Sequence, residues 1–144
     1  MTVIATDGES MAGDSLTTAG GQIVGYSEKV RKFKDGRIAG ACGDTTECRK
    51  LMRWLEHGGE HPAVGDAFAI VLKTDGTVEY WDKEFEPLPY VVPMAIGSGG
   101  DIAIGAMLAG ADPERAVRLT MERDRQCGGD VTVHHRPGKL RRVV

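Results

Sequence analysis

The chain has 144 residues, of which 41% are hydrophobic, and a formal net charge of −3 at pH 7. This length predicts one domain, spanning residues 1–144, with enough apolar residues to bury a core. The acidic balance argues against a general nucleic-acid binder, and no apolar run approaches the ~20 residues that a membrane-spanning helix needs.

Three Asp-Gly pairs predict three tight β-hairpins, because both residues of such a pair tolerate the positive φ of a two-residue turn. Each pair lies between two short runs that contain apolar residues. The pairs are Asp7-Gly8, which joins 2–6 to 9–13; Asp35-Gly36, which joins 29–33 to 37–43; and Asp75-Gly76, which joins 66–73 to 77–81.

A helix is predicted over residues 44–59, between the second and third hairpins. Asp44 is expected to be its N-cap, and Glu47 three residues later completes a capping-box pattern. Four residues then follow helical spacing, namely Cys48, Leu51, Met52 and Leu55. The pair Gly58-Gly59 ends the helix.

The later elements begin with a strand at 90–97, where proline is expected near the start or on an edge. Two helices follow, over 99–110 and 111–124, and Asp112-Pro113 starts the second with proline at its first position. Residues 130–136 alternate as a last strand, with 139–144 as its candidate partner. Segregated hairpins and helices predict an α+β fold with helices on antiparallel sheets.

Three cysteines, Cys42, Cys48 and Cys127, form neither an even set nor a CxxC motif. This count is not typical of a disulfide framework or a zinc site, and it favours a reducing compartment. We also expect no metal ion and no cofactor. The first residues lack the pattern of a signal peptide, which favours the cytoplasm. The GSGG turn at 97–100 is an alternative phosphate site, but it lacks a P-loop lysine and a complete GxGxxG pattern.

Thr2 becomes chemically interesting if Met1 is removed, as is normal before a small side chain. Removal leaves a free α-amine beside the hydroxyl, which is a nucleophile with a built-in base. A nearby cation would lower the pKa of that amine from its usual ~7.7–8.0 and keep it able to accept a proton at neutral pH. A buried cation needs a carboxylate partner, and the candidates are Lys29, which starts the third strand, and Asp14, which ends the second.

The sequence resembles the threonine peptidases of the proteasome β-subunit type, including their bacterial HslV-like form. Six motifs stand in the order of that family, and together they cover about residues 2–135. They are Thr2, AGDS at 12–15, EKVRKF at 28–33, IAGACGDTTE at 38–47, AIGSGGDIAIGA at 95–106 and RDRQCGG at 123–129. Each motif is weak alone, whereas six in the right order are specific.

The resemblance implies a role for each matching residue. Thr2 matches the nucleophile, Asp14 its buried acid, Lys29 the lysine that tunes the site, and Gly43 the glycine whose N–H stabilises the oxyanion. Three further residues match the group that orients the terminal amine: Ser98, Asp124 and Cys127, the last replacing a more usual serine. The implied side-chain pocket is lined by Thr17, Ser27, Arg31, Ala41 and Thr45, and Arg31 would favour acidic or polar side chains.

The resemblance also implies the four-layer αββα sandwich of N-terminal nucleophile hydrolases and the cleavage of peptide bonds in unfolded substrates. It implies a homo-oligomeric ring, such as two stacked hexamers, that encloses the sites. The chain has no Walker motif, so ATP-driven unfolding would need a separate ATPase partner. Two alternatives stay open: a non-catalytic ring assembly protein that retains Met1, and an amidase of the same fold that acts on a small molecule.

Overall fold

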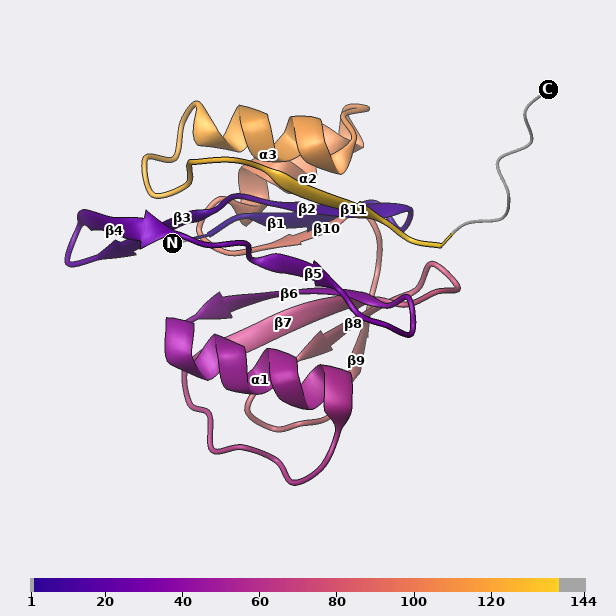
Figure 1. The fold of residues 1–144 in the computed structure, drawn as a ribbon. Coiled ribbons are helices and arrows are strands. Elements are labelled where there is room, and N and C mark those ends of the chain that lie inside the picture. The colour runs from indigo at the N-terminus through magenta and orange to yellow at the C-terminus, as the bar shows by residue number, and fades with distance from the viewer. Residues whose placement is uncertain (1, 138–144) are drawn as a thin grey trace.

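The computed structural model describes residues 2–137, and within them two antiparallel sheets lie face to face between outer helices (Figure 1). The first sheet has the strand order β10-β1-β2-β11 and the second has the order β5-β6-β7-β8-β9. The strands of the first are β1 (Ile4–Thr6), β2 (Ser10–Gly13), β10 (Met94–Ile96) and β11 (Thr132–His135). Those of the second are β5 (Val30–Lys32), β6 (Ile38–Gly43), β7 (Ala67–Leu72), β8 (Val78–Trp81) and β9 (Leu88–Tyr90).

The helices α2 (Gly100–Leu108) and α3 (Pro113–Met121) cover the first sheet, and α1 (Thr45–His57) covers the second (Figure 1). Side chains alternate across a strand, so the central strands β1 and β7 each contribute to two cores. On β1, Ile4 packs between the sheets while Ala5 packs under α2 and α3. On β7, Ile70 packs between the sheets while Val71 packs under α1. The α+β class and the four-layer αββα arrangement are therefore confirmed.

Gly13 and Gly40 allow the two sheets to approach closely at the end that carries the chain terminus. A Cβ at Gly13 would lie 2.7 Å from Val30 Cγ2, and one at Gly40 would lie 2.9 Å from Ile4 Cδ1. Both distances are shorter than ordinary carbon contacts, so the missing side chains bring β1 and β2 against β5 and β6.

All three Asp-Gly hairpins are confirmed: β1 pairs with β2, β5 with β6, and β7 with β8. The helix N-cap is also confirmed, since Asp44 accepts from the Glu47 N–H at 3.1 Å. The capping box is wrong in its second half. The Glu47 carboxylate instead accepts from the N–H groups of Gly65, at 2.9 Å, and Asp66, at 2.7 Å, which fastens the loop before β7 to α1.

Three other parts of the chain differ from the expected elements or go beyond them. The strand expected at 90–97 is only β10, because residues 91–93 separate it from β9. A hairpin of β3 (Leu16–Ala19) and β4 (Gln22–Tyr26) was not predicted. The expected partner of the last strand, 139–144, lies outside the described residues, and β11 pairs with β2. None of the helices within residues 2–137 is long and apolar enough to cross a membrane.

Candidate active site

Asp14 is held by backbone hydrogen bonds where the β1–β2 hairpin ends. The register of the pair brings Asp14 beside Val3, and the Asp14 N–H donates to the Val3 carbonyl at 3.2 Å. The Asp14 carboxylate in turn accepts from the Val3 N–H at 3.1 Å and from the Gly128 N–H at 3.0 Å. Its side chain is fully buried, so these hydrogen bonds replace the water that the charge has lost.

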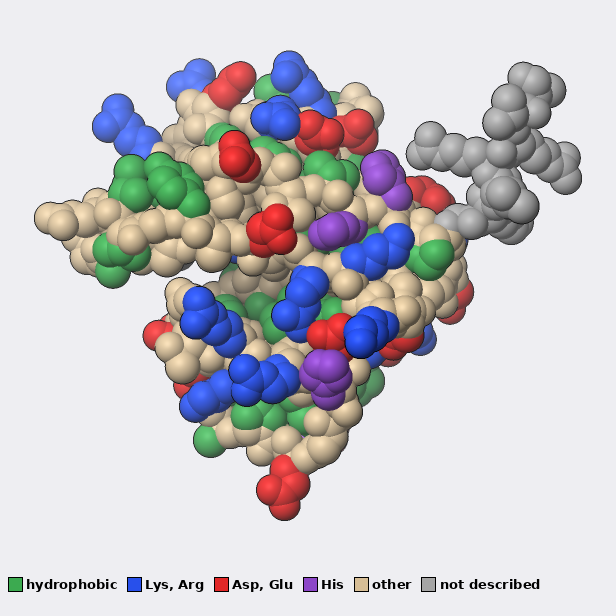
Figure 2. Space-filling model, in the orientation of Figure 1, with side chains coloured by type: hydrophobic (Ala, Val, Ile, Leu, Met, Phe, Trp, Pro, Cys, Tyr) green, Lys and Arg blue, Asp and Glu red, His purple; other side chains and the backbone are tan. Residues whose placement is uncertain are grey.

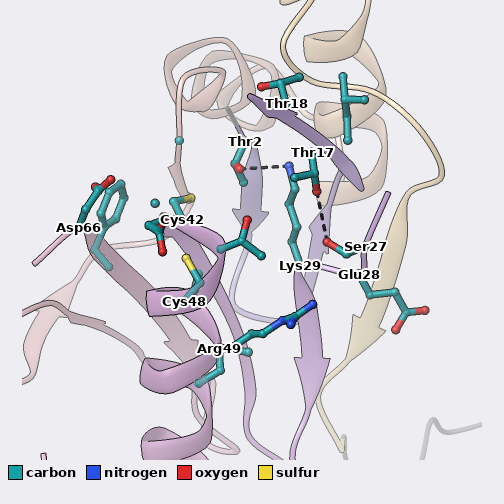
Figure 3. Close-up of a pocket in the computed structure, with 18 of the residues that line it drawn as sticks. Thr2, Thr17, Thr18, Ser27, Glu28, Lys29, Cys42, Cys48, Arg49 and Asp66 are labelled. Carbon is teal, nitrogen blue, oxygen red and sulfur yellow. Dashed lines mark hydrogen bonds between the residues drawn. The ribbon is translucent and has the colours of Figure 1, made fainter. Parts of the chain in front are cut away.

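Lys29 joins Asp14 to Thr2. Its Nζ lies 3.0 Å from Asp14 Oδ1 and donates to Thr2 Oγ1 at 3.1 Å, as Figure 3 shows for the second contact. Both the Lys29 side chain, 11% exposed, and Thr2, 9% exposed, are nearly shielded from water. Three residues that lie within two positions of the ends of β1, β2 and β5 therefore form one chain of contacts, in which the Lys29–Asp14 ion pair is hydrogen-bonded to the Thr2 hydroxyl.

Gly43 ends β6 on the opposite wall of the site. Its φ of +126° and the lack of space beside the Asp66 carbonyl both demand glycine. The Asp44 N–H donates to the Asp66 carbonyl at 2.8 Å, so the alternation of the β6–β7 ladder directs the Gly43 N–H away from β7. That direction is the side of β5, where Lys29 lies.

Ser98, Asp124 and Cys127 form a cluster behind Thr2. The Ser98 hydroxyl donates to Asp124 Oδ2 at 2.8 Å and lies 3.8 Å from Cys127 Sγ. Burial raises the pKa of Asp124, but hydrogen bonds from the Gln126 N–H and from Ser98 outweigh it, and the net pKa is lowered. Asp124 is therefore ionised at neutral pH, and it can hold further donors.

The turn that carries Ser98 also fixes Thr2 through glycines that the sequence interpretation did not assign. The Gly99 N–H donates to the Thr2 carbonyl at 3.3 Å. Gly97 has a φ of +98°, and a Cβ there would overlap the same carbonyl. The signal was present in the density of glycines at 97–100, because a close backbone approach is a common reason for such a run.

A pocket of about 1220 Å³ opens beside Thr2. Its wall includes Thr2, Lys29, Gly43 and Ser98, and all five residues expected to form the side-chain pocket, namely Thr17, Ser27, Arg31, Ala41 and Thr45. Asp14, Asp124 and Cys127 do not line it and lie behind its wall. The wall also includes Arg49 and Arg53 of α1, which the sequence interpretation missed. Among residues 2–137, no three His, Cys, Asp or Glu side chains gather as a metal site.

The cysteines near the pocket are poor nucleophiles. Burial raises the pKa of the Cys42 thiol strongly, that of Cys48 to about 11 and that of Cys127 to about 12. All three are protonated at neutral pH, and only a thiolate attacks efficiently.

We therefore expect iodoacetamide to alkylate the native protein at about pH 8 roughly two orders of magnitude more slowly than the urea-unfolded protein, whose thiols have an ordinary pKa near ~8.5. Mass spectrometry of both samples over time checks this result. One thiol that reacts as fast in the native protein as in the unfolded one would contradict it.

The fold of the chain is similar to that of known proteins, although their sequences differ widely from it. No family profile matches the chain. HslV from Trypanosoma brucei is 20% identical, with a TM-score of 0.71 over 92% of this chain and 97% of that one. BPH from Thiobacillus denitrificans in complex with epoxomicin is 18% identical, with a TM-score of 0.71 over 93% and 97%. A structure of the same BPH described without epoxomicin is also 18% identical, with a TM-score of 0.68 over 93% of this chain and 96% of that one. The chain therefore has the fold of HslV and BPH, which is that of the N-terminal nucleophile hydrolases.

Proposed function

We propose that the chain is a threonine endopeptidase of the proteasome and HslV type, in which Thr2 becomes the nucleophile when Met1 is removed. The observation that carries this proposal is the position of Lys29 Nζ, 3.1 Å from the Thr2 hydroxyl and 3.0 Å from a fully buried carboxylate. A large pocket beside that hydroxyl leaves room for a peptide. The likeness to a BPH structure that holds epoxomicin adds support.

In the proposed reaction, the Thr2 hydroxyl attacks a peptide carbonyl while the free α-amine of the same residue accepts its proton. The Lys29 ammonium favours the neutral form of the amine through charge repulsion. The Gly43 N–H stabilises the oxyanion, an effect typically worth ~2.7–4 kcal/mol per donor. The amine then passes the proton to the leaving amine, and water activated by the same base hydrolyses the ester.

Ser98 and Asp124 act through position. The turn that carries Ser98 contacts the Thr2 backbone, and the Ser98 hydroxyl donates to Asp124, so a shift of Ser98 moves the Thr2 amine relative to its hydroxyl. Cys127 packs against Ser98 in this arrangement. The Cys127 thiol is a weaker hydrogen-bond donor than a serine hydroxyl, so it supports Ser98 mainly by van der Waals contact.

We further propose that residues 1–144 act as one cytoplasmic domain within a homo-oligomeric ring, for which a double hexamer is the first candidate, and that a separate ATPase supplies unfolded substrate. Three exposed apolar side chains on β4 support a surface that another subunit covers: Ile23 is 62%, Val24 62% and Tyr26 63% exposed. Large exposed apolar patches commonly mark association sites. The β3–β4 hairpin protrudes beside the hollow of the pocket (Figure 2).

Labelling the protein purified from its native host with an epoxyketone tests the proposal, because that reagent requires both a hydroxyl and a free amine on one residue. We expect an intact mass without Met1 and one adduct that maps to Thr2. Retained Met1 without an adduct would favour the assembly protein. Hydrolysis of small amides without any peptide cleavage would favour the amidase.

A further inference from the structure

The pocket wall carries four side chains that are cationic at neutral pH, and they differ in what they contact. Lys29 pairs with Asp14, and Arg31 pairs with Glu56 at 2.8 Å. Within residues 2–137, Arg49 and Arg53 have neither an ion pair nor a hydrogen bond through their guanidinium groups. Two of the four charges are therefore available to a ligand.

Arg49 and Arg53 stand four residues apart on one face of α1, and both are exposed. Like charges at this spacing destabilise a helix. In Figure 3, Arg49 reaches from α1 toward the base of Lys29, while the carboxylate of Glu28 points away from it. Lys and Arg side chains gather over α1 below the hollow in Figure 2. Among the described residues 2–137, the two arginines therefore have no acidic partner, and both line the pocket.

The acidic residues of the pocket do not neutralise the charges of Arg49 and Arg53. Glu56 is engaged by Arg31, and Asp44 accepts from the Glu47 N–H as the N-cap. Asp66 lies across the pocket from Arg49 in Figure 3. The pocket therefore has a basic end along α1 and an acidic end near the start of that helix.

We infer that Arg49 and Arg53 bind an acidic side chain of the substrate, which makes peptides that carry Glu or Asp beside the scissile bond the preferred class. The inference rests on the proposed function. It also changes which residue would give the preference for acidic side chains. The family resemblance indicated Arg31, but the Arg31 guanidinium is already paired with the Glu56 carboxylate, whose side chain is only 16% exposed. A guanidinium fork matches a carboxylate geometrically and forms charge-assisted hydrogen bonds with it.

Binding tests the inference without catalysis. In a Thr2→Ala protein, we would measure the affinity of three N-acetylated peptide amides, Ala-Ala-Ala-X with X as Glu, Gln or Lys. The Glu peptide should bind roughly fivefold more tightly than the Gln peptide, which corresponds to about two exposed ion pairs. The advantage should shrink in about 0.5 M salt, where the Debye length falls to a few ångströms.

Variants locate the preference. Arg49→Gln with Arg53→Gln should remove it, and Arg49→Glu should shift it toward the Lys peptide. Lys50→Gln is the matched control, because Lys50 is an exposed cation of the same helix that does not line the pocket. Glu56→Gln should increase the preference, because it releases Arg31. Equal affinities for the Glu and Gln peptides, or a loss shared by the Lys50 control, would overturn the inference.

Cleavage of the same three peptides with a coumarin leaving group on X separates this inference from the proposed function. Cleavage without a preference for Glu would overturn only the acidic subsite. Acid-selective binding without any cleavage would support the subsite and overturn the peptidase.

Discussion

Thr2→Ala is expected to lower kcat/KM for peptide cleavage by a factor on the order of 10⁴ or more, because it removes the attacking oxygen and leaves every other group in place. Lys29 loses one hydrogen bond but keeps Asp14, so the free energy of unfolding should change by only about 1 kcal/mol. Steady-state cleavage of fluorogenic peptides and urea unfolding measure the two quantities.

Thr2→Ser is the matched control. It keeps the hydroxyl that accepts from Lys29, so it should retain activity within about a factor of ten. Ala, Ser and Thr are all small enough to permit removal of Met1, and intact mass checks that the three proteins share the same terminus. Activity that survives in the Ala variant would exclude Thr2 as the nucleophile.

The hairpins could be predicted because their turns are coded locally. Asp7-Gly8 places glycine at a φ of +91° between β1 and β2, and Asp35-Gly36 places glycine at a φ of +94° between β5 and β6. The β3–β4 hairpin was missed although Gly20-Gly21 is itself a turn signal. Neighbouring Ile23 and Val24 are both exposed, so this strand does not show the alternation that a buried face imposes.

Residues 90–97 show a second reason why sequence patterns fail, namely a strand that was predicted as continuous but is interrupted. Its composition is typical of one continuous strand, but the chain crosses from the second sheet to the first within it. β9 pairs with β8 in one sheet, and β10 pairs with β1 in the other. Only tertiary packing decides where such a segment changes sheets, so an apolar run alone does not reveal the break.

The site was predictable where neighbouring hairpins bring residues together. Thr2 and Asp14 lie at the open end of one hairpin, and motif order supplied Lys29 as their partner. The ion pair of Arg31 with Glu56 was not predictable, because it depends on how α1 lies along β5. The same helix placement turns Arg49 into the pocket, and nothing in the sequence spacing distinguishes Arg49 from its neighbour Lys50.

Lys29→Met is expected to reduce both stability and activity. Methionine fills the space of the lysine stem but leaves the fully buried Asp14 carboxylate without its cation. Removing one partner of a buried ion pair typically costs about 3–5 kcal/mol. Loss of the charge that tunes the amine should lower kcat/KM by roughly 10²–10⁴. Lys34→Met, at an exposed lysine, is the control and should stay within about 0.5 kcal/mol of the parent.

Adding Asp14→Asn to Lys29→Met separates the loss of stability from the loss of activity. The double variant removes the uncompensated charge, so it should be more stable than Lys29→Met alone. It should not regain full stability, because both carboxylate oxygens accept backbone N–H groups and an amide accepts at only one of its two positions. Activity should stay lost, since no cation remains beside Thr2. If cleavage recovered together with stability, Lys29 would hold the fold of the site and play no part in its chemistry.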